Sequence, residues 1–239
     1  MRCQPDNRLG DTCRSTGQLH RKVTNVELIQ FARPYNRHVD LLTALGRIVP
    51  FAFASGVNLY ATIAVAGLCA RLGLVTLPDQ FRVFSNGAVI VIALTMYLVE
   101  FIADKVPWVD TAWDAVHTVI RPIGGALVAV VALGDAAPGA QVAAALLGGA
   151  VALTTHVTKA GTRAVVNASP EPFSNWTLSL AEDLFVVGLT WFATQHPWLA
   201  AGLTFVLLAG IVTAGSFLIK AARRRFGARA QRAGAAGAP

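Results

Sequence analysis

The sequence predicts an all-α, polytopic membrane protein, a bundle of about six transmembrane helices whose first helix is interrupted near Gly56. Of the 239 residues, 54% are hydrophobic and 14% are charged, whereas ordinary globular proteins have about 25% charged residues. The apolar residues lie in blocks of about twenty, the length that a helix needs to cross about 30 Å of hydrocarbon. The three cysteines have no metal-ligand spacing and Cys69 lies inside an apolar block, so a disulfide framework is not expected.

The excess of positive charge fits a membrane surface better than a nucleic acid. The formal net charge is +7, and the Lys and Arg residues concentrate near the two ends of the chain, beside apolar blocks. This placement is typical of membrane topology and of attraction to anionic lipids. We therefore expect the lipid bilayer as the main partner, anionic lipids at the basic C-terminal tail, and no nucleic acid; the oligomeric state stays open.

Composition divides the chain into three regions. Residues 1–39 are polar and irregular, and we expect a loosely ordered cytoplasmic tail. Residues 40–219 hold the apolar blocks and form the predicted transmembrane domain. Residues 220–239 are basic and rich in Ala and Gly, which predicts a disordered tail.

The first apolar segment, 41–75, is too long for one plain crossing, since roughly 35 helical residues would reach over about 50 Å. Pro50 and the sequence Ser55-Gly56-Val57-Asn58 interrupt it, which predicts two helical pieces. Breaks of this kind recur at transporter binding sites, where the freed backbone meets protein or a cavity. A kink that serves only packing fits the pattern equally well.

Five further spans follow, each identified by an apolar run between polar loops. The third is expected to kink at Pro122, and the sixth, which is uncharged, to pack at the periphery. Their approximate ranges are 87–103, 110–133, 141–167, 175–193 and 198–218.

Two signals orient the predicted bundle. If the interrupted segment counts as one crossing, both basic termini lie on one side, which the positive-inside rule assigns to the cytoplasm. The same register puts Trp108, Trp113 and Trp176 at the inner interface and Trp191 and Trp198 at the outer one, as aromatic belts require. If the first segment forms a hairpin instead, the N-terminus moves outside.

Charged residues gather where the second span gives way to the third. Glu100 and Asp104 are four residues apart, so they share one helix face. After Pro107, a second helix carries four polar residues within about 60° of one another. These residues are Asp110, Asp114, His117 and Arg121.

The fourth and fifth spans carry a matching set of polar residues. His156, Lys159, Arg163 and Asn167 form a stripe on the fourth, and Glu182 and Asp183 lie inside the fifth. All these faces fall in the cytoplasmic half of the predicted bundle. Because an isolated ion in a low dielectric costs several kcal/mol, these groups are expected to pair. We expect Arg121 to bind a carboxylate and name Glu182 as the candidate.

The carboxylates outnumber the bases by two when Lys105 is included, and the surplus could exchange protons or hold a cation. We predict that a substrate or ion is bound by Ser55, Asn58, Glu100, Asp104, Asp114, His117, Arg121 and Glu182. Lys159, Arg163, His156 and Asp183 are the predicted structural charge partners. Lys105, Asp110, Lys159 and Asp183 also fit helix ends that simply reach the inner interface. No catalytic residue or cofactor is predicted, and a metal ion stays an open question.

Several motifs together resemble a bacterial membrane protein family filed as domain of unknown function 4126. They are Ser55-Gly56-Val57-Asn58-Leu59-Tyr60, the run from Glu100 to Asp114, Arg121-Pro122, and the segment 167–175 with Ala181-Glu182-Asp183. The resemblance covers about residues 42–193. It implies a multi-pass protein of the bacterial cytoplasmic (inner) membrane and supplies no activity.

Three functions remain open on the sequence. The leading hypothesis is transport of a cation, a proton or a small solute through the charged intramembrane site. The second is a metal-dependent membrane enzyme that acts on a lipid phosphate, with carboxylates on Mg²⁺ and basic residues on the phosphate. The third is a non-catalytic assembly factor in which the charges only hold helices together. No nucleophile motif or Gly-rich phosphate loop supports a named reaction, so an enzyme is the less favoured class.

Overall fold

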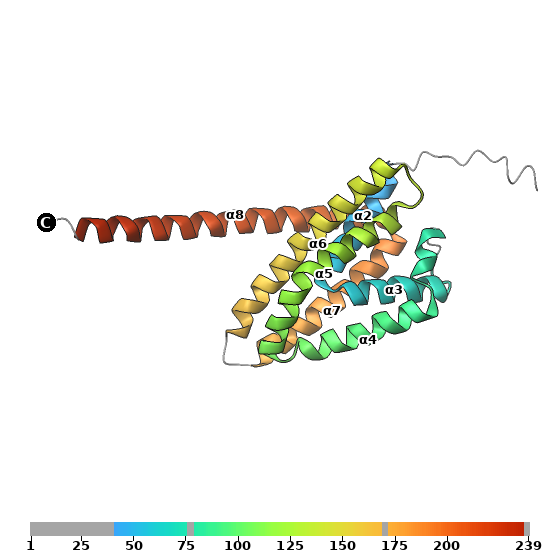
Figure 1. Ribbon diagram of the computed structural model, residues 1–239, viewed down its shortest axis with the longest axis horizontal. Coiled ribbons are helices and arrows are strands. Elements are labelled where there is room, and N and C mark those ends of the chain that lie inside the picture. Colours follow the sequence, from blue (N-terminus) through green and yellow to red (C-terminus); the bar gives the residue numbers. More distant parts are fainter. Residues whose placement is uncertain (1–40, 76–78, 169–171, 237–239) are drawn as a thin grey trace, which may run out of the picture. The chain divides into compact units, whose positions relative to one another are not determined.

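The computed structural model describes residues 41–75, 79–168 and 172–236, and every regular element in these ranges is a helix. All of them belong to one compact unit, Val39–Pro239, and the predicted tail 1–39 lies outside the described residues. The elements, labelled as in Figure 1, are α2 (Leu41–Val57), α3 (Leu59–Arg71), the short 3-10 helix η1 (Asp79–Val83), α4 (Gly87–Ala103), α5 (Pro107–Leu133), α6 (Pro138–Asn167), α7 (Pro172–Gln195) and α8 (Pro197–Ala236).

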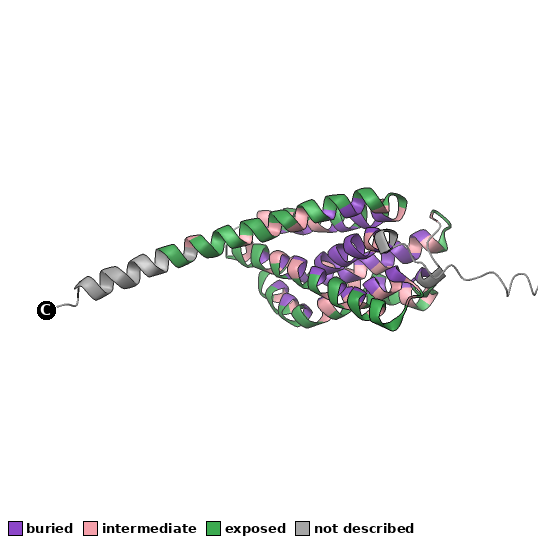
Figure 2. Ribbon diagram, turned by 90° about the horizontal axis from the view of Figure 1, so that it is seen from above, coloured by how far each residue is buried: buried purple, intermediate pink, exposed green. Residues whose placement is uncertain are grey.

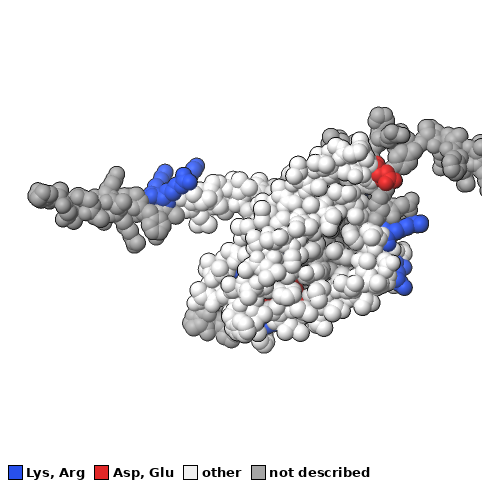
Figure 3. Space-filling model, in the orientation of Figure 1, with Lys and Arg blue, Asp and Glu red and all other residues white. Residues whose placement is uncertain are grey.

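The helices have the length and composition of membrane spans. Four of the described helices are long and apolar enough to cross a bilayer, namely α5, α6, α7 and the first part of α8. The apolar helices α2, α3 and α4 are shorter, at 10–17 residues. The predicted helical membrane protein is therefore supported, but the predicted count of six spans is not confirmed. Figure 3 shows a bundle surface with few charged side chains, which fits a lipid environment.

The predicted interruption of the first apolar segment is present, one residue wide, at Asn58. This residue has an extended backbone (φ −150°, ψ 101°), and its side-chain oxygen accepts a hydrogen bond from the amide of Ala61 at 2.9 Å. It thus caps the N-terminus of α3, a position that favours Asn. Pro50 does not interrupt the helix: α2 continues through it.

α2 and α3 form a V whose tip, at Asn58, lies inside the bundle. Near the start of α2, a Cβ on Gly46 would lie 3.6 Å from the Trp198 ring at the start of α8. Near the end of α3, a Cβ on Gly67 would lie 3.1 Å from Ile90 near the start of α4. Figure 1 shows the start of α2 and the end of α3 at the same end of the bundle. This arrangement agrees with the hairpin alternative, in which the segment begins and ends on one side.

The centre of the bundle is the close pair α5 and α6. A Cβ on Gly125 would lie 2.3 Å from the Cβ of Ala152, and one on Gly148 would lie 2.3 Å from the Cβ of Ala129. Neither glycine can carry a side chain without separating the helices, so both are needed for this approach. The pair α5 and α6 therefore provides the packed surface on which the tip of the V lies.

α8 packs at the periphery, as predicted for the last span. Only 6% of its most apolar window is buried, and Figure 2 shows that most of its coloured part is exposed. α8 extends to Ala236, and so continues through most of the segment 220–239 that composition predicts to be a disordered tail. The domain boundaries within the chain remain predictions.

Candidate functional site

Charged side chains from α4 to α7 meet at one place inside the bundle, between the tip of the V and the end where α4 gives way to α5. We call this set the charged cluster. All its members are buried except Glu182, which is partly buried. They are Glu100 and Asp104 of α4 and its C-cap, Asp110, Asp114 and Arg121 of α5, Lys159 and Arg163 of α6, and Glu182 and Asp183 of α7.

Arg121 connects four elements through a fully buried guanidinium. Its Nη2 donates to Glu100 Oε1 at 2.5 Å, and its Nη1 lies 3.7 Å from Asp114 Oδ1. The same Nη1 donates to His156 Nδ1 at 2.8 Å and to the carbonyl of Gly56, at the V, at 3.3 Å. The prediction that Arg121 binds a carboxylate is thus correct, although its partners are Glu100 and Asp114.

The pairing of Arg121 with Glu182 was wrong for a geometric reason. Glu182 lies on α7, and its Oε2 is bound on the α6 side, 3.3 Å from Arg163 Nε and 3.6 Å from Lys159 Nζ. Glu100 of α4 takes the place at Arg121 instead. Helical spacing identifies the face on which a charge lies, but it does not identify the helix that this face meets.

His156 is held as a neutral imidazole. Because a guanidinium can only donate, the Nδ1 that faces Arg121 must accept, and the ring proton then lies on Nε2. From Nε2 the ring donates to the carbonyl of Asp114 at 3.1 Å. His156 therefore adds a hydrogen-bond acceptor to the cluster and no charge.

His117 lies beside the cluster rather than in it. Its Nδ1 donates to the carbonyl of Trp113 at 2.8 Å, and its Nε2 is hydrogen-bonded to the Tyr60 hydroxyl at 3.1 Å. The ring also stacks on Trp113, with centroids 4.6 Å apart. Tyr60, on α3, is a contact that helical spacing within one span could not predict.

Lys159 occupies the middle of the cluster. Its Nζ lies 3.2 Å from Glu100 Oε1, 3.5 Å from Asp104 Oδ2 and 3.6 Å from Glu182 Oε2. It also donates to the carbonyl of Val57 at the V, at 3.2 Å. The ammonium group is thus shared by four oxygen atoms, and none of them is as close as the carboxylate that each arginine binds.

Arg163 binds the cluster end of α4 and the start of α7. Its Nη2 lies 2.7 Å from Asp104 Oδ2, and its Nε lies 3.7 Å from Asp110 Oδ1 and 3.3 Å from Glu182 Oε2. Its Nη1 donates to Asn175 Oδ1 at 2.5 Å. Asn175, which the sequence analysis does not single out, is therefore a further member of the site.

Of the two polar residues predicted at the break, the structure brings one to the cluster. Asn58 Nδ2 donates to Asp183 Oδ1 at 3.2 Å, while the Ser55 hydroxyl donates to the carbonyl of Phe51 in its own helix. Lys105 points elsewhere: its Nζ donates to the hydroxyl of Ser179 at 2.5 Å. Ser55 is thus buried beside the site without joining its ion pairs.

The acidic groups of the cluster are incompletely satisfied. Six carboxylates face three clustered bases and nearby Lys105, and the neutral His156 adds no positive charge. Buried oxygens of Glu100, Asp104 and Asp183 have no hydrogen-bond partner. No grouping of three or more His, Cys, Asp or Glu within the described ranges is arranged to hold a metal ion; Lys159 and Arg163 lie between these carboxylates instead.

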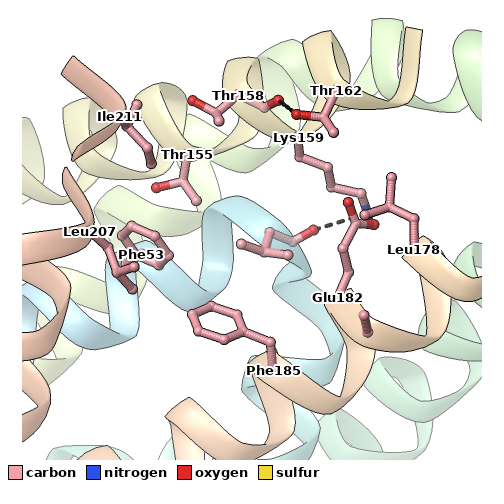
Figure 4. A pocket seen from close by; sticks show the side chains of 12 residues that line it. Phe53, Thr155, Thr158, Lys159, Thr162, Leu178, Glu182, Phe185, Leu207 and Ile211 are labelled. Carbon is pink, nitrogen blue, oxygen red and sulfur yellow. Dashed lines mark hydrogen bonds and ion pairs between the residues drawn. The ribbon is translucent and has the colours of Figure 1, made fainter. Parts of the chain in front are cut away.

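A cavity of about 330 Å³ adjoins the cluster between α2, α6, α7 and α8. Glu182 and Lys159 lie at one side of it and point toward one another, while Phe53, Leu207 and Phe185 line the rest (Figure 4). The Glu182 side chain is 14% exposed, whereas that of Asp114 is 6% exposed and those of Glu100 and Asp104 at most 1%. Glu182 is therefore the carboxylate through which a molecule in the cavity meets the cluster.

Comparison with known proteins places the chain in a family and gives it no activity. No curated protein matches the chain, and no solved structure does. A family model described as Domain of unknown function (DUF4126) matches residues 45–216, which include the tip and most of the V and the whole charged cluster. The chain therefore belongs to this family of proteins with a domain of unknown function, DUF4126.

Proposed function

We propose that the protein carries a cation across the bacterial inner membrane and that the charged cluster binds this cation on its way. The observation that supports the proposal best is the meeting of a helix break with the cluster. The carbonyls of Gly56 and Val57, which the break frees, accept from Arg121 and Lys159. Broken helices that present such carbonyls to an ion are a recurring feature of transporter sites.

In the proposed mechanism Lys159 is the resident cation that a substrate displaces. Its ammonium group is shared among Glu100, Asp104 and Glu182 at 3.2–3.6 Å, so losing one of these contacts leaves the others. A cation that reaches Glu182 takes that oxygen, and Lys159 moves toward Glu100 and the carbonyl of Val57. The two surplus carboxylates supply the attraction, since charges interact strongly in a poorly solvated site.

Arg121 has a different role in this mechanism. Its close contact with Glu100, together with the contacts to His156 and Gly56, fixes α4, α6 and the V around the site. It keeps Glu100 ionised while the cluster is empty. Arg121 is therefore a positioning residue, and Glu182 is the residue proposed to touch the cation.

Flux through liposomes that contain the purified protein tests the proposal. Proton, Na⁺, K⁺ and divalent cation flux are each followed with an ion-sensitive dye, and flux of an organic cation is followed with radiolabelled tetraphenylphosphonium. We expect one of these fluxes above that of protein-free liposomes, and Glu182→Gln to lower it at least about tenfold, since one ionic contact in a low dielectric is lost. Lys220→Gln, an exposed charge change on α8, should leave it unchanged.

A folded protein that passes none of these ions would contradict cation transport by the cluster as stated. So would a flux that Glu182→Gln leaves at its original rate. Either result would favour the assembly-factor function, because every arginine of the cluster and Lys159 already have carboxylate partners that hold helices together.

A further inference from the structure

The cavity beside Glu182 is unusual for an ion site because its walls are largely apolar. Phe53 and Phe185 both line it and pack against one another edge to face, with ring centroids 6.1 Å apart at 68°. The hydroxyl groups of its threonines donate to backbone carbonyls of their own helix, α6. The Thr155 hydroxyl donates to the carbonyl of Val151 at 2.8 Å, and the Thr162 hydroxyl donates to that of Thr158 at 2.9 Å. Apart from Lys159, which the cluster holds, the wall offers a ligand apolar surface and hydrogen-bond acceptors.

A second cavity, of about 850 Å³, continues from the first along α6 and α8. The two share Thr158, Thr162, Leu207 and Ile211, so they form one space that opens between these helices. Gly161 lines the outer part, and a Cβ built on it meets nothing within 4 Å. Because α6 and α8 are membrane spans by length and composition, this opening faces the hydrocarbon of the bilayer.

Apolar cavity walls together with one carboxylate, Glu182, favour some cations over others. A small inorganic ion would have to exchange its hydration shell for apolar walls, which costs several kcal/mol or more. An organic cation with a hydrophobic body gains from the same walls by burying apolar surface, and aromatic faces attract its charge further. The ionised Glu182 at the inner end supplies the opposite charge.

We infer that the transported cation is organic and hydrophobic, an ammonium or phosphonium ion with apolar substituents, and that it enters sideways from the bilayer between α6 and α8. This inference rests on the proposed cation transport and specifies its substrate. The apolar substituents lie against the wall formed by Phe53, Phe185 and Leu207, and the cationic centre faces Glu182. The threonine hydroxyls act only as acceptors in this arrangement.

Equilibrium binding of radiolabelled tetraphenylphosphonium to the full chain in nanodiscs tests the inference, with empty nanodiscs as the background. We expect saturable binding, weakened at least about tenfold by Glu182→Gln because one charge contact in a low dielectric is lost. Tetraphenylborate, which has the same shape and the opposite charge, should show no saturable binding. Absence of saturable tetraphenylphosphonium binding, or equal binding of the two ions, would overturn the inference.

A matched pair of glycine variants tests the side entrance without changing a charge. Gly161 lines the opening, whereas Gly188 on α7 lies outside both cavities; a Cβ on either meets nothing within 4 Å. Gly161→Leu should slow tetraphenylphosphonium association at least about tenfold, as a side chain placed in the entry path excludes the ligand. Gly188→Leu should leave the rate unchanged. Equal rates in the two variants would exclude this entrance even if Glu182→Gln fails to fold.

The binding and flux measurements can contradict the substrate class and the transport function independently. Inorganic cation flux that depends on Glu182, without tetraphenylphosphonium binding, overturns the substrate class and leaves cation transport standing. Saturable, Glu182-dependent binding in a protein that moves no cation supports the substrate class and overturns transport.

Discussion

Arg121 shows how one buried side chain can organise several helices. Its guanidinium binds Glu100 of α4, Asp114 of its own helix, His156 of α6 and the carbonyl of Gly56. Each contact satisfies part of a charge that would otherwise be very costly at this depth. The ion pair with Glu100 is the closest of them and is the one that sequence spacing could not identify.

Removing Arg121 should cost more stability than any single packing contact provides. Arg121→Ala leaves Glu100 ionised and partly uncompensated, which is expected to cost roughly 3–5 kcal/mol. Adding Glu100→Gln removes the stranded charge and should recover part of the loss. Unfolding of all three variants in detergent, followed by circular dichroism, measures the coupling.

Glu182→Gln is the control variant for this test, since Glu182 binds Lys159 and Arg163 rather than Arg121. Its coupling to Arg121→Ala should be clearly smaller than that of Glu100→Gln. Purely additive effects of Arg121→Ala and Glu100→Gln would show that their contact contributes nothing to stability.

At the residue scale the sequence identified the charged residues but not their partners. Glu100, Asp114 and Arg121 were expected inside the bundle because each lies on a polar face within apolar sequence, and all three are buried. The spacing of residues shows which of them share a face of one helix. It does not show which other helix that face contacts. Tyr60 and Asn175 illustrate this point, because nothing in their own segments indicates His117 or Arg163 as a partner.

At the scale of single elements, the V of α2 and α3 depends on the absence of a side chain at Gly56. A Cβ there would lie 2.4 Å from the carbonyl oxygen of Ala152 and 2.8 Å from the Cβ of Thr155, both on α6. Neither neighbour is the end of a flexible side chain. The tip of α2 therefore approaches the α6 backbone as closely as a glycine permits.

Gly56→Ala should destabilise the protein by about 1–3 kcal/mol, the usual cost of overpacking a close contact. Gly161→Ala on α6 is the control, because its new methyl group meets nothing within 4 Å. It should be neutral or slightly stabilising, since Ala is the better helix former. Thermal unfolding of both variants in the same detergent compares them; equal midpoints would mean that α2 can shift away from α6 at no cost.

The sequence predicted that the first apolar segment is broken and left open whether its two halves form one crossing or fold back as a hairpin. Gly and Asn near the middle of the segment indicated the break, and Asn58 carries it out by capping α3. Whether a broken helix continues or returns depends on what its second half meets. Here α3 returns along α4, an element that lies later in the chain, so local sequence could not decide it.

At the scale of the whole molecule, the direction of each helix predicts the sidedness of the loops. Reporter fusions after Asn167 and Arg225 should read as cytoplasmic, because the exposed Lys220, Arg223 and Arg224 follow the apolar part of α8. Fusions after Gly134 and Gln195 should read as periplasmic. A periplasmic signal after Arg225 would reverse the proposed orientation.

A fusion placed before α2 distinguishes the V from a single broken crossing. The V predicts a periplasmic signal there, because the start of α2 and the end of α3 lie at the same end of the bundle (Figure 1). A single crossing, the expectation from the basic N-terminal segment, predicts a cytoplasmic signal. The two arrangements differ by one passage of the membrane, so one reporter separates them.

The basic residues that follow the apolar part of α8 should attract anionic lipid. Each Lys or Arg near such a surface contributes about 1 kcal/mol, and salt screens the attraction. Co-sedimentation of a peptide spanning 220–239 with anionic vesicles should therefore fall steeply between low and high salt, and zwitterionic vesicles should retain little peptide. Binding that is insensitive to salt would contradict an electrostatic origin.

The V also constrains the order in which the protein can be assembled during synthesis. α2, α3 and α4 leave the ribosome first, and with α4 come Glu100 and Asp104, whereas Lys159 and Arg163 follow on α6. Until α6 is made, these acids lack two of the bases that neutralise them, and the tip of the V lacks the helix against which it packs. Nascent chains that end before α6 must therefore keep this region out of the hydrocarbon or be recognised as unfinished by quality control in the membrane.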